Sequence, residues 1–286
     1  MAQMTTPALS PQTGSAVEKS DSIFANLQTT AIELLCLHRK FLIYNLVQRN
    51  LKLKYRQSFL GILWTVLAPA LNAAVYFVVF SFVMRVQLPH YLVFVLSGLL
   101  PWMFFSLTLS QGMESIAGNW KLVTKVPLPL NVFPFVEVAT CLLNYLLALP
   151  VLFVVALFDH APFGLPMLMI PIYVALLTVQ AYGFALLLSV SYVYFRDLRH
   201  VLSIFMQMWF YGTPIIYSAA MVPAKVQPYI WLNPIGYIFE GLNTAMAMGT
   251  FIDGSKVLIS LAWTVVIFLG GAWVYRRQRR FLVEGI

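Results

Sequence analysis

The chain has 286 residues, of which 60% are hydrophobic and only 10% are charged, and its formal net charge is +8. Soluble domains contain about 25% charged residues, so this composition excludes a protein whose main solvent is water. The charges form a few short clusters, and the uncharged stretches between them are long enough for about 20 helical residues to cross the ~30 Å hydrocarbon core of a bilayer. We therefore expect an all-α membrane protein that crosses the bilayer several times.

The N-terminal part contains two segments that differ from the rest. Residues 1–25 are rich in Ser, Thr and Pro and contain no apolar run of the secretory-signal type, which predicts a flexible cytoplasmic tail. Residues 26–58 are expected to lie at the membrane interface. Residues 42–60 have the pattern of an amphipathic helix, with a basic face made by Gln48, Arg49, Lys52 and Arg56 and an apolar face made by Leu42, Ile43, Leu46, Val47 and Leu53. We expect the basic face to meet lipid phosphates on the inner side of the membrane.

Residues 59–286 form the predicted transmembrane domain. Their uncharged runs predict six spans, at residues 59–84, 91–113, 138–158, 167–195, 201–224 and 257–275. Basic residues near spans stay on the cytoplasmic side, and with the N-terminus inside only Arg85, Lys225 and Lys256 of the 18 Lys and Arg residues fall outside. We therefore expect a bacterial cytoplasmic (inner) membrane protein with both termini in the cytoplasm. The basic charge is interpreted as this orientation signal and not as a nucleic-acid footprint.

Two connections between the predicted spans have their own patterns. The cytoplasmic loop at residues 114–131 (ESIAGNWKLVTKVPLPLN) contains a short helix-forming stretch and Trp120, a residue type enriched at interface hot spots. We interpret Trp120 as a docking anchor, and the alternative is an aromatic residue of the membrane-surface belt. Residues 226–252 are broken by Pro and Gly into pieces too short to cross, which predicts an outer re-entrant helical hairpin. The alternative is a loop that lies on the surface.

The sequence lacks the motifs of a self-sufficient enzyme. It has no GxxxxGK[ST] phosphate loop, no HExxH and no GxSxG, so any ATP that drives transport is hydrolysed by another subunit. Cys36, Cys141 and the four histidines show no metal-ligand spacing, and we expect no cofactor on this chain. Glu137 and Glu240 are too isolated to form a chain of intramembrane carboxylates, which argues against an ion-coupled pump.

Aromatic residues recur in the first and fifth predicted spans. They are Trp64, Tyr76, Phe77, Phe80, Trp209, Phe210, Tyr211 and Tyr217. Aromatic rings stack on the C–H faces of sugars, so a path lined by rings suits a sliding polysaccharide. The alternative is that these side chains pack between helices, as aromatics commonly do in membranes.

Five stretches together resemble a known family. They are NLKLKYRQSFLGILWTVLAPALN, LSGLLPWMFFSLTLSQGMESI, NWKLVTKVPLPLNVFP, YFRDLRHVLSIFMQMWFYGTPIIY and WLNPIGYIFEGL. In order and spacing they resemble the membrane subunit of ABC-2 type polysaccharide exporters, from about residue 27 to the C-terminus. KYRQSFLGILW and FRDLRHVL are more similar to the O-antigen and teichoic-acid exporters than to the capsule exporters.

The resemblance implies a type V exporter-like homodimer of six-helix subunits that encloses a channel and binds two copies of a separate Mg-ATP-hydrolysing subunit. The substrate it implies is a polysaccharide linked to a polyprenyl diphosphate. By the same resemblance, Glu114, Asn119, Trp120, Lys121 and Lys125 belong to a coupling helix that docks on the ATPase. Arg49, Lys52 and Arg56 belong to a gate helix that meets the lipid diphosphate. The implied channel lining is Trp64, Tyr76, Phe80, Trp209, Phe210, Tyr211 and Tyr217, and residues 229–248 form the outer re-entrant pair.

Other functions stay open at this point. An ABC-2 exporter of capsule polysaccharide, of drugs or of another lipid shares the six-span plan. A membrane enzyme acting on a polyprenyl phosphate, with Glu137, Asp197 and Arg199 as its active cluster, belongs to a different class. It lacks a recognisable catalytic constellation, and we expect a transport subunit instead.

Overall fold

The computed structural model describes residues 40–55, 61–79, 88–123, 129–223, 225, 227–228 and 232–284, and the regular structure in these ranges is helical. The chain divides into two units, Met1–Lys40 and Phe41–Ile286. Only Lys40 of the first unit is described, and the helices from Phe41 onward belong to the second. The predicted N-terminal tail lies outside the described residues.

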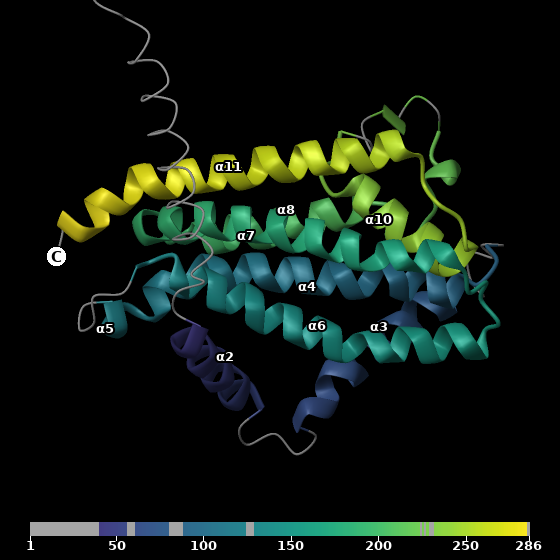
Figure 1. The fold of residues 1–286 in the computed structure, drawn as a ribbon, viewed down its shortest axis with the longest axis horizontal. Helices are drawn as coiled ribbons and strands as arrows, with labels where there is room; N and C mark the ends of the chain where they lie inside the picture. Colours follow the sequence, from purple (N-terminus) through teal and green to yellow (C-terminus); the bar gives the residue numbers. More distant parts are fainter. Residues whose placement is uncertain are drawn as a thin grey trace, which may run out of the picture. The chain divides into compact units, whose positions relative to one another are not determined.

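Four long helices are apolar enough to cross a membrane: α4 (Tyr91–Gly118), α6 (Val132–Phe158), α7 (Ile170–Tyr194) with the preceding 3₁₀ turn η4 (Leu165–Met169), and α11 (Gly254–Glu284). These helices confirm the second, third, fourth and sixth predicted spans. Helix α4 contacts both α6 and α7, and α7 also packs along α11 (Figure 1). Because α4 and α7 have neighbours on two sides, they supply most of the buried core, whereas much of α11 is exposed.

Small residues let the long helices approach closely where they cross. A Cβ atom at Gly271 in α11 would overlap the carbonyl oxygen of Gly183 in α7. A Cβ at Gly112 in α4 would lie 2.7 Å from the Cβ of Ala185 in α7. Close backbone approach through small residues is how helices gain packing energy in lipid, where the hydrophobic effect does not drive them together. These crossings hold α4, α7 and α11 together.

The helix in the fifth predicted span is shorter than expected, and the first predicted span is described only in part. Helix α3 (Trp64–Phe77) follows the turn η2 (Gly61–Leu63), and residues 80–84, which complete the first predicted span, lie outside the described residues. Helix α8 (Leu198–Tyr211) has 14 residues and ends at Gly212. A bilayer core requires about 20 helical residues, so the described helices themselves show four candidate spans and not six.

An irregular segment follows α8, although its sequence is apolar. Chain carbonyls there accept hydrogen bonds from side chains elsewhere: Asn233 Nδ2 donates to the Gly212 oxygen (3.4 Å), Asn243 Nδ2 to the Pro214 oxygen (3.1 Å), and Tyr91 Oη to the Ile216 oxygen (2.9 Å). Non-helical backbone survives at membrane depth only where protein groups satisfy it. Within residues 201–223, the described part of the predicted fifth span, a helix is therefore followed by a coil whose carbonyls are hydrogen-bonded and by the 3₁₀ turn η5 (Ala219–Met221).

A short buried helix lies between this coil and α11. Helix α10 (Gly236–Asn243) continues into a π-helical turn, η6 (Thr244–Met248), and contacts α4, α7 and α11. Gly241 is required there, because a Cβ would collide with the ring of Tyr173. Residues 236–248, the later part of the segment predicted as a re-entrant hairpin, thus form a helix packed against other helices of the protein. Part of the first arm, residues 229–231, lies outside the described residues.

Two shorter helices lie at the end of the molecule where α4 ends. Helix α2 (Lys40–Tyr55) confirms the predicted N-terminal helix as far as Tyr55, and α5 (Trp120–Val123) follows α4 directly. The predicted division of α2 into a basic and an apolar face is followed only in part. Leu46 and Val47 are buried as expected, but Leu53 is exposed and Arg49 is half-buried, because Arg49 turns toward α4.

Candidate functional site

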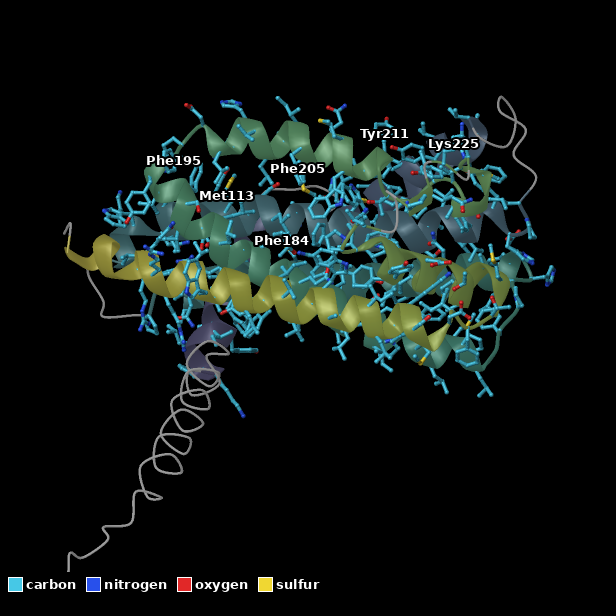
Figure 2. The ribbon with its side chains drawn as sticks, turned by 90° about the horizontal axis from the view of Figure 1, so that it is seen from above. Met113, Phe184, Phe195, Phe205, Tyr211 and Lys225 are labelled. Atoms are coloured by element: carbon cyan, nitrogen blue, oxygen red, sulfur yellow. The ribbon has the colours of Figure 1, made fainter. Side chains whose placement is uncertain are left out.

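An aromatic cluster joins α8 to the core. The Trp209 ring centroid lies 5.0 Å from that of Phe205, 5.3 Å from Phe105 and 5.7 Å from Phe184. Its Nε1 donates to Asn233 Oδ1 at 2.9 Å, which anchors the indole. Figure 2 labels Phe184 on α7 and Phe205 on α8, the helices that this cluster connects. The contacts of Trp209 are those of a packing residue.

The other predicted channel aromatics differ in exposure. Tyr211 is 59% exposed and Trp64 is 46% exposed, whereas Phe210 is buried against Trp102 (5.5 Å between ring centroids) and Tyr76 (5.9 Å). Tyr217 is half-buried and donates its hydroxyl proton to the Tyr211 carbonyl at 2.8 Å. Phe80 lies outside the described residues.

A cavity of about 320 Å³ brings some of these rings together. It lies between α3, α4 and α8, and its lining includes Tyr76, Phe210 and Tyr211 together with the amides of Asn72 and Gln207. Rings beside amide groups can contact a sugar through both its C–H faces and its hydroxyls. Three predicted channel residues therefore share one hollow, whereas Trp209 does not line it.

The predicted gate and coupling residues meet at Asn119. The Asn119 carbonyl accepts the N–H groups of Leu122 (2.8 Å) and Val123 (3.1 Å), so this residue begins α5, and its Nδ2 donates to the Ser115 carbonyl of α4 at 2.9 Å. Arg49 Nη2 donates to Asn119 Oδ1 at 2.9 Å. Helix α2 is thereby attached to the junction of α4 and α5, a contact that the sequence did not predict.

A second hydrogen bond attaches α2 to α6. Asn50 Nδ2 donates to Glu137 Oε1 at 2.8 Å. The Arg49 Nε atom is buried and has no hydrogen-bond partner within the described ranges. Among the other predicted gate residues, Lys52 is exposed and Arg56 lies outside the described residues. Arg49 is therefore the described gate residue that binds another helix through Nη2 and still has an Nε–H group that can donate.

The surface of the coupling region is polar with one exposed aromatic. Trp120 is 37% exposed, Lys121 is exposed, and Lys125 lies outside the described residues. Glu114 accepts from Arg199 Nε at 2.6 Å, which joins the end of α4 to the start of α8. The hydrogen bond and the negative charge of Glu114 raise the pKa of Arg199. This exposed pair contributes little stability, because water screens it.

The residues of the hypothetical enzyme cluster have separate partners. Glu137 accepts from Asn50, Arg199 donates to Glu114, and the Asp197 carbonyl accepts backbone N–H groups of the first turn of α8. Among the described residues no group of three or more His, Cys, Asp or Glu side chains could hold a metal ion. The charged groups of Glu137 and Arg199 thus bind different partners and do not form one cluster.

An apolar hollow lies beside α2. It has a volume of about 460 Å³, its walls come from α3, α4 and α6, and Lys54 of α2 lies at its rim. Polar wall groups include Ser106, Ser110 and Asn144. A hydrocarbon wall with a cationic rim is chemically suited to a chain that ends in an anionic head group.

Comparison with known proteins assigns most of the chain to one family. Residues 42–247, which run from α2 to the π-helical turn after α10, match the ABC-2 type transporter family. The chain belongs to the ABC-2 type transporter family. The matched residues include α2, the α4–α5 junction and α10.

Individual relatives cover most of the chain. The O-antigen export system permease protein RfbA of Myxococcus xanthus is 31% identical over 247 residues, which are 86% of this chain and 95% of that protein. A protein of the same name from Klebsiella pneumoniae is 32% identical over 212 residues, 72% of this chain and 80% of that protein. The polysialic acid transport protein KpsM of Escherichia coli is 22% identical over 256 residues, 86% of this chain and 96% of that protein.

Sequence reasoning missed the side chains that support the coil after α8. Asn233 accepts from Trp209 and donates to Thr213 Oγ1 at 2.7 Å, and Asn243 accepts from Ser97 Oγ at 2.8 Å. Both asparagines are buried. The sequence signal for them was an asparagine within an apolar stretch, because a buried amide side chain almost always has a hydrogen-bond partner.

Proposed function

We propose that this chain is the membrane subunit of an ATP-driven exporter of polysaccharide linked to a polyprenyl diphosphate. The observation that carries the proposal is the similarity to the M. xanthus O-antigen permease along 95% of that protein's length. Such coverage includes the helices that line the hollows described above, and not only an isolated motif.

The O-antigen type of substrate is favoured over the capsule type. Identity to the O-antigen permeases is 31% and 32%, against 22% to the polysialic acid transport protein. Export of capsule polysaccharide is the second candidate, because the KpsM similarity also extends along 86% of the chain. The alternative of a drug exporter has no comparable relative among these proteins.

In this proposal the chain crosses the inner membrane six times with both termini in the cytoplasm. Helices α3 and α8, with the apolar residues that follow each of them, supply the two crossings beyond the four long helices. The Lys and Arg distribution supports this orientation, with α2 and α5 on the cytoplasmic side. Two copies enclose the path, and the irregular coil and α10 lie toward the outer side.

The proposed mechanism assigns the energy source to a partner and the path to this chain. A separate subunit hydrolyses Mg-ATP, and its closure moves α5, which transmits the movement to α4 through the Asn119 junction. The Arg49–Asn119 hydrogen bond passes the same movement to α2, where the spare Nε donor and the cationic Lys54 suit a lipid diphosphate. The glycan then moves past Tyr76 and Tyr211.

The proposal is tested by co-expression with the ABC ATPase gene of the same operon and purification through a tag on this chain. We expect the ATPase to co-purify and its hydrolysis rate to rise when O-antigen linked to undecaprenyl diphosphate is added. Capsule precursor linked to a phospholipid is the comparison substrate, and preferential stimulation by that precursor would favour the second candidate. Absence of any ATPase in the purified material would contradict the exporter proposal.

A further inference from the structure

A third cavity lies at the end of the molecule away from α5. Its volume is about 410 Å³, and it is enclosed by the first turn of α4, the coil after α8, and α10 with its π-helical turn. The lining includes Glu240, Asn243 and Thr244 from the helix, Gln227, and the rings of Phe94 and Tyr217. Ligand sites have volumes of about 300–1,000 Å³ and combine apolar walls with a few polar groups, as this cavity does.

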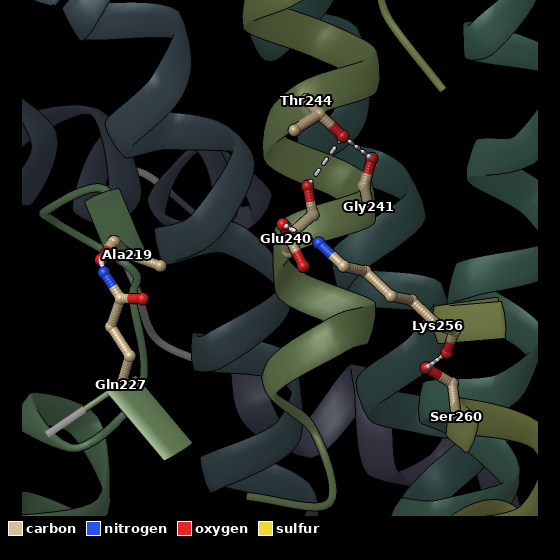
Figure 3. Close-up of polar contacts among 7 residues, drawn as sticks. All are labelled: Ala219, Gln227, Glu240, Gly241, Thr244, Lys256 and Ser260. Atoms are coloured by element: carbon tan, nitrogen blue, oxygen red, sulfur yellow. Dashed lines mark hydrogen bonds and ion pairs between the residues drawn. The ribbon is translucent and has the colours of Figure 1, made fainter. Parts of the chain in front are cut away.

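Only one of the two carboxylate oxygens of Glu240 has a hydrogen-bond partner among the described residues. Its Oε1 atom accepts from Lys256 Nζ at 2.8 Å (Figure 3), whereas Oε2 is buried without a hydrogen-bond partner among the described residues. A buried carboxylate oxygen without a donor is costly, and native proteins rarely leave one in that state. The Oε2 atom can therefore accept one further hydrogen bond.

Two neighbouring side chains, Thr244 and Gln227, can also accept hydrogen bonds. Thr244 Oγ1 directs its proton to the backbone carbonyl of Glu240 at 2.8 Å (Figure 3), so its lone pairs still accept. Gln227 Nε2 donates to the carbonyls of Val222 (3.1 Å) and Ala219 (3.4 Å). That orientation leaves the Gln227 amide oxygen as an acceptor. The cavity thus presents acceptors, and a complementary ligand must supply hydrogen-bond donors.

The charge balance distinguishes a neutral donor from a cation. Lys256 already neutralises Glu240, and Asn243 commits Nδ2 to the Pro214 carbonyl and Oδ1 to Ser97. A divalent cation requires several oxygen ligands and favours anionic ones, whereas the one carboxylate of this cavity is already paired with a lysine. Hydroxyl groups supply protons without adding charge, and the rings of Phe94 and Tyr217 offer apolar surface to C–H groups.

We propose that this outer cavity is a binding subsite for one neutral sugar ring, with Glu240 Oε2 and Thr244 Oγ1 accepting from its hydroxyls. The inference rests on the proposed function, and adds a place where the glycan pauses on the outer side of the path. Because Glu240 of α10 is paired with Lys256 in the first turn of α11, a ring bound to Glu240 is linked to α11 through this ion pair.

The direct test is saturation-transfer NMR on the complete complex in lipid nanodiscs, with a mixture of the methyl pyranosides of glucose, galactose, mannose and rhamnose as the probe. We expect transfer to the ring protons of at least one glycoside. Thr244→Val keeps the side-chain shape but removes the acceptor, and should weaken that affinity about two- to tenfold, the effect of one lost hydrogen bond. Thr244→Ser should restore it, and Glu240→Gln should weaken it as well.

The control variant is Thr250→Val, which makes the same change at an exposed threonine outside the cavity lining. Its basal ATPase activity and glycoside binding should equal those of the unchanged complex. Equal glycoside binding by Thr244→Val and the unchanged complex would overturn the subsite. Calorimetric binding of Ca²⁺ that Glu240→Gln abolishes, with no transfer to any glycoside, would also overturn it in favour of a cation site.

A parallel export assay in inverted vesicles separates the subsite from the proposed function. Vesicles that take up lipid-linked glycan with ATP, but bind no glycoside in the cavity, would retain the exporter and exclude the subsite. Glycoside binding that depends on Thr244, in a complex that transports no glycan, would support the subsite and exclude the exporter.

Discussion

Arg49 links two regions that the sequence assigns to different tasks. It lies on α2, the predicted gate helix, and donates to Asn119, which ends α4 and begins α5. The guanidinium is half-buried, so this charge-assisted hydrogen bond is less screened than a surface pair. A movement of α5 therefore reaches α2 through one side chain.

Arg49→Ala should reduce the stimulation of the partner ATPase by lipid-linked glycan more than it reduces basal hydrolysis. The lost hydrogen bond is worth about 1–2 kcal/mol, enough to uncouple the helices without unfolding them. Asn119→Ala should have the same effect, and the double variant should add little, because both changes remove one interaction. Lys40→Ala, which removes an exposed cation at the start of the same helix, is the control. Equal loss of basal and stimulated rates would indicate misfolding instead.

Adjacent glycines of α11 differ in what surrounds them. A Cβ at Gly271 collides with Gly183 of α7, whereas a Cβ at Gly270 meets nothing within 4 Å. Gly271→Ala should therefore destabilise the protein by about 1–3 kcal/mol, the usual cost of overpacking. Gly270→Ala should be neutral or slightly stabilising, because alanine is the better helix former. Thermal unfolding followed by fluorescence-detected size exclusion compares them, and similar midpoints would contradict the close crossing.

Variants of Trp209 and Tyr211 distinguish an aromatic residue that packs between helices from one that lines the proposed glycan path. Trp209→Ala removes a ring in contact with Phe105, Phe184 and Phe205 and should cost about 3–5 kcal/mol. Tyr211→Ala removes an exposed ring and should leave the melting temperature nearly unchanged, while reducing export of long glycan chains as resolved on gels. Unchanged export by a stable Tyr211→Ala variant would exclude the aromatic path.

At the scale of elements, apolar run length predicted the long helices well. The runs at residues 91–113, 138–158, 167–195 and 257–275 each correspond to one helix, because a bilayer imposes a minimum length. The helices extend beyond the uncharged runs: α6 begins at Val132 and includes Glu137, whose carboxylate is satisfied by Asn50. A prediction from uncharged runs stops before Glu137, because the sequence does not show that Asn50, 87 positions away, binds its carboxylate.

Run length did not predict where α8 ends, because composition does not report which backbone groups have hydrogen-bond partners. Residues 212–217 are as apolar as a span, yet the helix ends at Gly212 and the free carbonyls bind Asn233, Asn243 and Tyr91. The sequence GTP at residues 212–214 was a local signal for the helix end, since the residue before proline avoids the α region. The distant donors carried no local signal. The sequence therefore predicted which types of residue belong to the candidate site, but it did not predict which residues they bind.

Helix α5 is short, and its exposed aromatic residue carries the docking prediction. Trp120→Ala should lower recovery of the ATPase subunit in a pull-down through a tag on this chain, because tryptophan contributes strongly at interfaces. Phe158→Ala is the matched control, since Phe158 is 81% exposed but ends α6 at the opposite end from α5. Unchanged recovery with Trp120→Ala would assign Trp120 to the aromatic belt of the membrane surface.

At the scale of the whole molecule, exposed apolar residues gather on particular helices. Helix α8 exposes Val201, Ile204, Phe205, Met208 and Tyr211, and α11 exposes a comparable apolar surface that includes Val266. Lipid can cover one such face, and in the proposed homodimer a second copy covers the other. Because the proposed glycan path includes Tyr211, α8 is the helix that should face the second copy.

Met208→Cys should therefore form a covalent dimer in membranes treated with a short bis-maleimide, after Cys36 is replaced by serine. Cys141 is buried and should not react. Val266→Cys on α11 is the control, because that side chain is 60% exposed but belongs to the helix expected to face lipid. Dimers resolved by denaturing gel electrophoresis with Met208→Cys alone would support a path between two α8 helices. Dimers with Val266→Cys alone would place α11 at the interface, and Tyr211 would then face lipid and not a glycan.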